Sequence, residues 1–283
     1  MLPLLPLLLP LVYPPLALGP SPQEAIGPTL PLEYASRDLD TGERGHFLFH
    51  YALEGEHGIA EPDINTSESF VLPSGRLCVL EGGGSYDLGN APDYIERLGC
   101  YLEEGLSKIR ALGFNGGEIP PELGRVFVIL YDHSGTAVPL NFPLVSGDIL
   151  LKSTMGQNTS KTVPVHEVFH QFQYTYTTHL EAWWLLEGTA KWSEDCVFDE
   201  SNRYRSQMNI YLGDPSVGLF QASYSAVAFW RYLSEHYGAV EAGCDVNVSW
   251  QRHRWEGLGE APRGPAAAAR APAREGSAAT LAG

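Results

Sequence analysis

Residues 162–173, TVPVHEVFHQFQ, contain the feature that most limits how this chain can fold. Two histidines, His166 and His170, stand four positions apart, and Glu167 directly follows the first. On an α-helix this spacing puts both imidazoles on one face, with Cβ atoms roughly 5–6 Å apart. Two such imidazoles can bind one Zn²⁺ at about 2.0–2.1 Å. The segment predicts a helix that carries part of a zinc site; the alternative is an amphipathic helix with exposed polar residues.

A catalytic zinc site needs a third protein ligand and an open position for water. A metzincin would supply Gly and His where this chain has Gln173 and Tyr176, so that subclass is excluded. A ligand from a following helix remains, and Glu187 is the candidate, with sixteen residues between it and His170. Glu167 is turned by about 100° from the residue before it on a helix, so it can lie beside the metal and act on its bound water.

The Glu187-bearing segment, AWWLLEGTAKWSED, predicts a helix over about 181–196. Its apolar residues are expected to pack it beside the first helix, and Gly188 allows a close approach; the apolar residues are Trp183, Trp184, Leu185 and Leu186. When a zinc-bound water attacks a peptide carbonyl, negative charge builds up on the carbonyl oxygen, and a hydrogen-bond donor must stabilise it. Tyr224 is the first candidate for this catalytic role, followed by His236 or Tyr237, and the alternative for each is a packing or capping residue.

The remaining pattern predicts strands first and helices afterwards, which indicates an α+β domain. Strands are expected at 46–53, 124–132 and 147–153, and helices at 91–114 and 221–237. The His-containing helix is expected to begin after TSKTVP, with Ser160 or Thr162 as its cap and Pro164 in its first turn.

Composition divides the chain into four parts. Residues 1–19 form a Leu-rich run that is typical of a secretory signal, although prolines interrupt it and no basic residue lies near Met1. Residues 20–44 are predicted to be a linker or propeptide, residues 45–255 the metallopeptidase domain, and residues 256–283, rich in Ala, Pro, Gly and Arg, a disordered tail. We expect a secreted protein without a stable membrane anchor.

Charge and cysteines bear on partners and compartment. The formal net charge of −16 argues against nucleic acid as a partner. The cysteines fit export: sequence proximity favours disulfides joining Cys78 with Cys100 and Cys196 with Cys244, three connectivities are possible, and buried free thiols are the alternative. A Ser or Cys hydrolase is disfavoured, because the chain has no G-x-S-x-G motif.

Three blocks, VHEVFHQFQYTY, WWLLEGTAKWSED and SYSAVAFWRYLSEHYG, resemble the secreted metalloproteases of the myxobacterial type, within the gluzincin or peptidase-MA-like zincins. The resemblance covers about residues 46–238. It implies a zincin-like fold with a mixed sheet, an active-site helix and a Glu-bearing helix. It also implies zinc ligands at His166, His170 and Glu187, with Glu167 as general base and then acid.

One departure from the gluzincin pattern lies in the Glu187-bearing segment. Many gluzincins have an acidic residue four positions after the ligand glutamate, where it orients a zinc-bound histidine. This position is Lys191 here, so Glu194 or Asp195 would have to serve.

The sequence thus predicts a secreted zinc metallopeptidase that hydrolyses a protein or peptide substrate. We expect the substrate to bind as an extended strand beside residues 147–153. The alternative is a catalytically inactive or truncated zincin-like domain with a binding or structural role. The intact Glu167 argues against that alternative, because a non-catalytic domain needs no base there. The low-complexity C-terminus argues for it.

Overall fold

The computed structural model describes residues 32–60, 68–80, 91–114, 125–132, 137–139, 148–176, 182–214 and 216–237. The expected signal (1–19) and tail (256–283) lie outside these ranges. None of the helices within them is long and apolar enough to cross a membrane. The elements are β1 (Leu32–Arg37), β2 (Arg44–Tyr51), β3 (Glu68–Val71), β4 (Leu77–Leu80), α2 (Asp93–Ala111), β5 (Val126–Tyr131), β6 (Ala137–Pro139), β7 (Ile149–Lys152), α3 (Gln157–Tyr176), α4 (Trp183–Val197), η1 (Asp199–Ser201), α5 (Tyr204–Gly213), η2 (Leu219–Gln221), η3 (Ser223–Ala226) and α6 (Val227–Tyr237).

Five strands form one mixed sheet in the order β1-β2-β5-β7-β6. The three central strands β2, β5 and β7 are parallel, and the outer strands β1 and β6 pair antiparallel. A separate hairpin joins β3 to β4. The apolar run in β5 is explained by its central place, because a strand flanked by parallel neighbours is usually buried on both faces. The α+β class and the mixed sheet are therefore confirmed.

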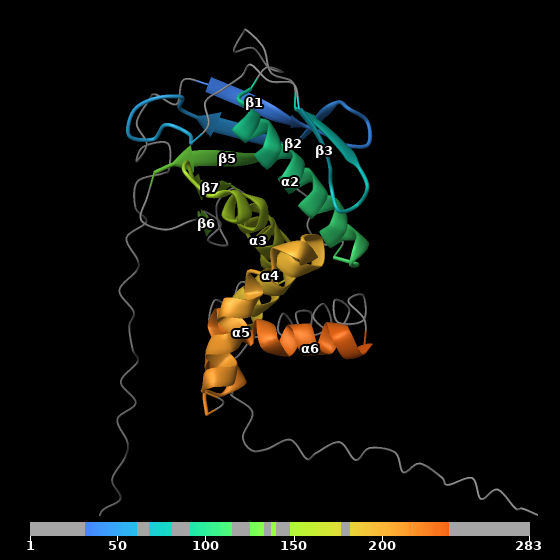
Figure 1. Ribbon diagram of the computed structural model, residues 1–283, viewed down its shortest axis with the longest axis vertical. Coiled ribbons are helices and arrows are strands. Elements are labelled where there is room, and N and C mark those ends of the chain that lie inside the picture. The colour runs from blue at the N-terminus through green and yellow to red at the C-terminus, as the bar shows by residue number, and fades with distance from the viewer. Residues whose placement is uncertain are drawn as a thin grey trace, which may run out of the picture.

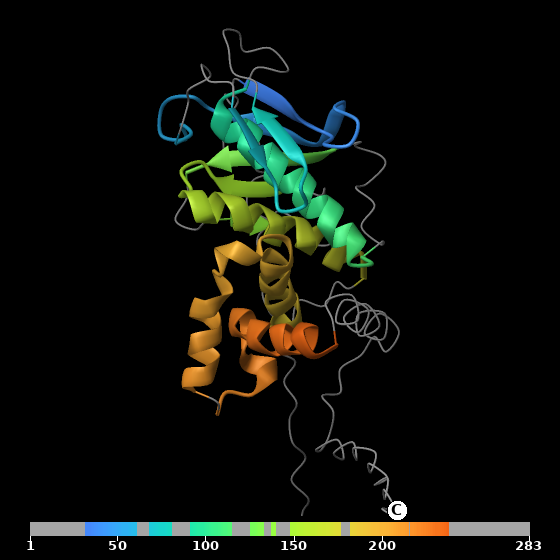
Figure 2. The same cartoon turned by 45° about the vertical axis from the view of Figure 1, so that its right-hand side comes forward.

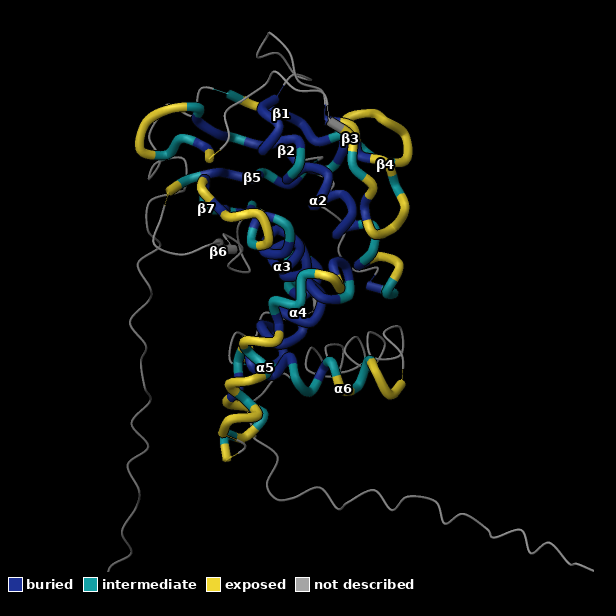
Figure 3. Tube along the Cα trace, viewed as in Figure 1, coloured by how far each residue is buried: buried dark blue, intermediate teal, exposed yellow. Residues whose placement is uncertain are grey.

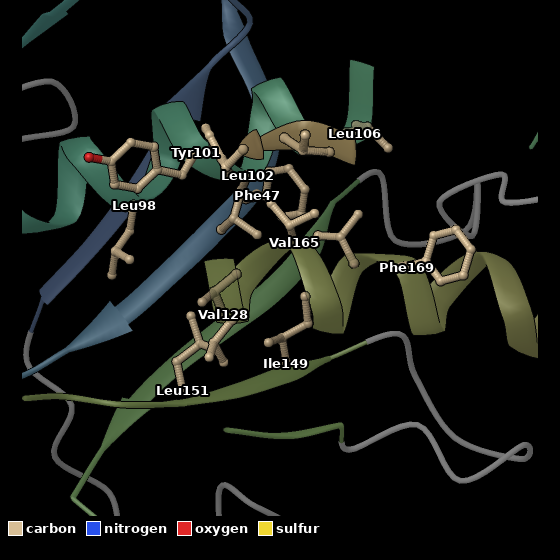
Figure 4. Packing of buried hydrophobic residues seen from close by; sticks show 14 of the residues in the cluster. Phe47, Leu98, Tyr101, Leu102, Leu106, Val128, Ile149, Leu151, Val165 and Phe169 are labelled. Carbon is tan, nitrogen blue, oxygen red and sulfur yellow. The ribbon is translucent and has the colours of Figure 1, made fainter. Parts of the chain in front are cut away.

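Helices α2 and α3 lie side by side over one face of this sheet (Figures 1 and 2). Every second residue of β2 points at them, so Phe47, Phe49 and Tyr51 are buried. Figure 4 shows the resulting core, in which Val165 of α3 packs against α2. Phe169, one turn further along α3, packs edge to face on Phe114 and Trp192. Helices α4, α5 and α6 extend away from the sheet beyond α3 (Figures 1 and 2). The burial map shows α3 as a buried helix in the middle of the molecule (Figure 3).

The observed helix α3 begins earlier than predicted. Its first residue is Gln157, so Ser160 and Thr162 are not caps, and Pro164 lies inside the helix rather than in its first turn. The two hydroxyls instead bond to carbonyls of their own helix: Ser160 Oγ donates to Gln157 at 2.9 Å and Thr162 Oγ1 to Asn158 at 3.0 Å. A proline inside a helix removes one backbone hydrogen bond, and the tertiary packing around α3 outweighs that cost.

The N-terminal boundary and the sheet edge also differ from expectation. Strand β1, at residues 32–37, lies within the predicted linker or propeptide and pairs with β2, so this part of the 20–44 prediction is wrong. The centre of this strand, residues 34–36, is buried. Residues 147–153 were expected to form a sheet edge. The strand there, β7, instead pairs with β6 on its outer side, and β6 is the edge strand.

A disulfide joins Cys78 of β4 to Cys100 of α2, across a Cα–Cα distance of 6.3 Å. This pairing is one of the two that sequence proximity favoured, and it holds the β3–β4 hairpin against α2. Cys196 forms no disulfide within the described ranges, and its expected partner Cys244 lies outside them. Burial raises the pKa of the Cys196 thiol, which keeps that group neutral.

An ion pair between β2 and α2 makes stability depend on pH. His46 bonds to the buried carboxylate of Glu103 through its backbone N–H at 2.6 Å and its Nδ1 at 2.8 Å. The hydrogen bond with Glu103 raises the pKa of His46, outweighing the opposite effect of burial. Because the pKa of His46 is higher in the folded than in the unfolded protein, its protonation stabilises the fold. This stabilisation is complete at pH values below the unfolded-state pKa of about 6.5, and it is lost as the pH rises through the folded-state pKa.

We therefore expect His46→Gln to lower the free energy of unfolding at about pH 6 by up to about 1 kcal/mol, and by less at about pH 8.5. The measurement is urea unfolding at both pH values with a chelator present, so that metal binding does not contribute. A pH-independent difference between the two proteins would contradict the ion pair.

Candidate metal centre

Helix α3 places His166 and His170 on one face, as their spacing predicts. Their rings are 4.7 Å apart between centroids and meet edge to face at 83°. Both residues are buried, with 5% and 2% of their surface exposed. An amphipathic helix with exposed polar residues is therefore excluded for this segment.

Helix α4 brings Glu187 to the same point. Its Oε2 lies 3.1 Å from His166 Nε2 and 3.8 Å from His170 Nε2. One ligand atom from each residue lies within 4.8 Å of the other two, and no other His, Cys, Asp and Glu group in the described ranges meets this criterion. Ligands at about 2.0–2.1 Å around a tetrahedral zinc are roughly 3.3 Å from one another. Two imidazoles and one carboxylate at these separations could hold a metal ion.

Close packing of α4 against the following elements fixes the position of Glu187. A Cβ added at Gly188 would lie 2.8 Å from Ala226 Cβ and 2.9 Å from Trp230 Nε1, so only glycine fits here without a shift. Trp184 stacks on Trp230 at 5.6 Å between centroids. Leu185 and Leu186 are buried as predicted. Trp183 is 51% exposed, so the prediction that it packs α4 against α3 is wrong. It is the first residue of α4.

The second ring nitrogen of His166 is bound by Glu194. His166 Nδ1 donates to Glu194 Oε1 at 3.0 Å, and the same carboxylate accepts from Lys191 Nζ at 2.9 and 3.0 Å. Of the two acids that sequence left open, Glu194 therefore contacts a histidine, whereas Asp195 pairs with Arg231 of α6. Burial acts to raise the pKa of Glu194, but its bond to His166 and the charge of Lys191 lower that pKa to about 2.

These carboxylates also set the charge of His166 in the metal-free protein. Burial acts to lower its pKa, but the bonds with Glu187 and Glu194 raise that pKa to about 10. His170 differs: burial and the neighbouring positive His166 lower its pKa to about 4. The two imidazoles are therefore inequivalent, one held by carboxylates and one kept neutral.

Glu167 lies beside the cluster and is 4% exposed. Its Oε2 has no hydrogen-bond partner among the described residues. Burial raises the pKa of Glu167 to about 7, assisted by the charges of Glu187 and Glu194 and opposed by His166. A carboxyl group with a pKa near the operating pH can both accept and return a proton.

Tyr224 covers one side of the cluster. Its ring stacks on His166 at 5.8 Å between centroids, and its hydroxyl hydrogen-bonds with Glu187. Burial and the charge of Glu187 raise its pKa, so the phenol stays protonated and able to donate. The other two candidates, His236 and Tyr237, end α6 at exposed positions; His236 bonds to the carbonyl of Tyr232 at 2.9 Å, outside the cluster.

Sequence reasoning missed Tyr174, a second phenol at the site. Its ring stacks on His170 at 5.8 Å and 19°. Burial raises its pKa, and the charges of Glu187 and Glu167 act in the same direction. The signal was present in the spacing, because residue 174 follows His170 by four positions and so continues the same helix face.

Comparison with protein-family models, curated proteins and solved structures found no match. The geometry of the cluster and the chemistry of its side chains therefore carry the inference of function.

Proposed function

We propose that this protein is a secreted zinc metallopeptidase of the gluzincin type. The observation that carries the proposal is a buried group of two histidines and one glutamate, from two packed helices, with a further carboxylate at its side. His166, His170 and Glu187 would hold the metal. Two nitrogens and one carboxylate oxygen form a common donor set of catalytic zinc sites, which favours Zn²⁺ over the oxygen-rich sites of Mg²⁺ or Ca²⁺.

The side chains around the cluster supply the remaining steps of peptide hydrolysis. A bound zinc ion would polarise the scissile carbonyl and acidify water. Glu167 would accept a proton from that water and return it to the departing amine, and its Oε2, which has no hydrogen-bond partner among the described residues, is available for this. Tyr224 would donate a hydrogen bond from its hydroxyl to the carbonyl oxygen as negative charge develops there, in place of its bond to Glu187. Its 44% exposure leaves it accessible from the solvent side.

An extended substrate needs backbone partners, and the edge strand provides them. In this sheet β6 is the edge next to β7, and it contacts α3, which carries both histidines. A peptide added to β6 as a further strand would thus run beside the helix of the metal ligands. The disulfide between Cys78 and Cys100 supports folding in an oxidising compartment and hence secretion.

The test of the proposed function is zinc stoichiometry, measured by elemental analysis of the purified chain and of Glu187→Ala. We expect about one zinc per wild-type chain and much less in the variant, because a catalytic site needs three protein ligands. Circular dichroism of both proteins checks that they are folded. A folded wild-type protein that takes up no zinc would refute the metal centre and the peptidase with it. A zinc-loaded protein that cleaves no unfolded protein would favour the binding or structural alternative.

A further inference from the structure

Gln173 of α3 connects His170 to helix α4, and every polar atom of its side chain is engaged. Its amide is buried, with 1% of the residue exposed. Gln173 Oε1 lies 2.5 Å from His170 Nδ1. Its Nε2 donates to the Leu186 carbonyl at 2.8 Å and to Thr189 Oγ1 at 2.7 Å. Leu186 immediately precedes Glu187, so one amide spans the two helices that bring the metal ligands together.

These contacts allow only one orientation of the amide. The Leu186 carbonyl can only accept a hydrogen bond, so the NH₂ group of Gln173 must face it. Oε1 then faces His170 Nδ1, and because an amide oxygen only accepts, Nδ1 must carry the hydrogen. In the neutral ring the lone pair is therefore on Nε2, the nitrogen 3.8 Å from Glu187 Oε2.

Without this amide the neighbouring charge would favour the opposite tautomer. The carboxylate of Glu187 lies on the Nε2 side of His170 and attracts a hydrogen to that nitrogen. Gln173 opposes this attraction from the Nδ1 side at a shorter distance. For His166 a carboxylate, Glu194, takes the corresponding place. The neutral amide orients His170 without adding a second negative charge.

We propose that Gln173 is a positioning residue that holds His170 as the Nδ1–H tautomer and so directs the Nε2 lone pair into the metal cluster. Its role toward a metal rests on the function proposed above, whereas the tautomer is a property of the metal-free protein. The tautomer can therefore be tested separately.

The first test is the ¹⁵N–¹H correlation spectrum of the histidine rings in the chelator-treated full chain, with His170 assigned by its absence in His170→Ala. We expect a protonated, pyrrole-type Nδ1 and an unprotonated, pyridine-type Nε2. In Gln173→Met, which keeps the volume but removes both hydrogen-bonding groups, the hydrogen should move largely to Nε2. A wild-type His170 protonated at Nε2 overturns the proposal without reference to any variant.

The second test is zinc affinity by competition with a chromophoric chelator. Gln173→Met should bind zinc about 10- to 100-fold more weakly, as is typical when a group orienting a metal ligand is removed. Gln173→Glu retains an acceptor toward Nδ1 but places a carboxylate oxygen against the Leu186 carbonyl, so it should recover only part of that loss. Gln157→Met makes the same chemical change at the exposed first residue of α3 and is expected to leave the affinity unchanged.

The outcomes separate the two proposals. Equal zinc affinity of wild type and Gln173→Met, or an unchanged His170 tautomer in that variant, would overturn the role of Gln173 and leave the zinc site standing. A wild-type chain with the expected tautomer but no zinc binding would instead refute the proposed function and support the orienting contact.

Discussion

Glu167→Gln is expected to retain about one zinc per chain and to lose peptide hydrolysis, with kcat reduced about 100- to 10,000-fold. The amide has nearly the shape of the carboxylate but accepts no proton. Glu167 does not belong to the group of three possible ligands, so its replacement leaves that group intact. The measurement is kcat on a fluorescently labelled unfolded protein, together with elemental analysis of the same samples.

Two further variants make this result specific. Glu54→Gln carries the same chemical change on an exposed turn of the structure and should keep full activity. His170→Ala should lose both zinc and hydrolysis, because it removes a ligand from the cluster. Equal kcat values for wild type and Glu167→Gln would refute the role of this residue as the base, even if zinc is bound.

The main helices could be predicted because they carry local, periodic signals. His166 and His170 share a face at a four-residue spacing, and α3 places them together as expected. Glu187 could also be predicted, since a short return helix brings a residue at that separation back to the same point. The start of α3 could not, because Pro164 favours a first-turn position and only tertiary packing holds it inside the helix.

The groups that orient the ligands were harder to predict, because they depend on contacts between helices rather than on periodicity. Gln173 served in the sequence only to exclude a metzincin, and its role depends on the Leu186 carbonyl of another helix. Glu194 and Asp195 were equivalent candidates in the sequence. The packing of α6 separates them, because it places Arg231 against Asp195 and leaves Glu194 for His166.

Lys191→Met is expected to lower the free energy of unfolding of the metal-free protein by about 3 kcal/mol, near the lower end of the cost of breaking a buried ion pair. Lys191 is 7% exposed and Glu194 3%, so neither charge is well hydrated. Removing the ammonium group takes two hydrogen bonds from the Glu194 carboxylate. Two other groups remain near the Glu194 carboxylate and limit the loss of stability: Arg203 Nη1, 3.8 Å from Glu194 Oε2, and the ring of His166. Urea unfolding with a chelator present measures the change.

A second substitution tests whether the loss comes from uncompensated charge rather than from altered packing. In Lys191→Met/Glu194→Gln both formal charges of the pair are removed, and replacing a whole buried pair by neutral groups is often close to neutral for stability. We therefore expect the double variant to be more stable than Lys191→Met alone. Lys161→Met removes a lysine that pairs with the more exposed Glu200, and it should cost less than about 1 kcal/mol. If the double variant were the less stable, the bond of the Glu194 carboxylate to His166 would contribute more to stability than the charge left unpaired by Lys191→Met costs.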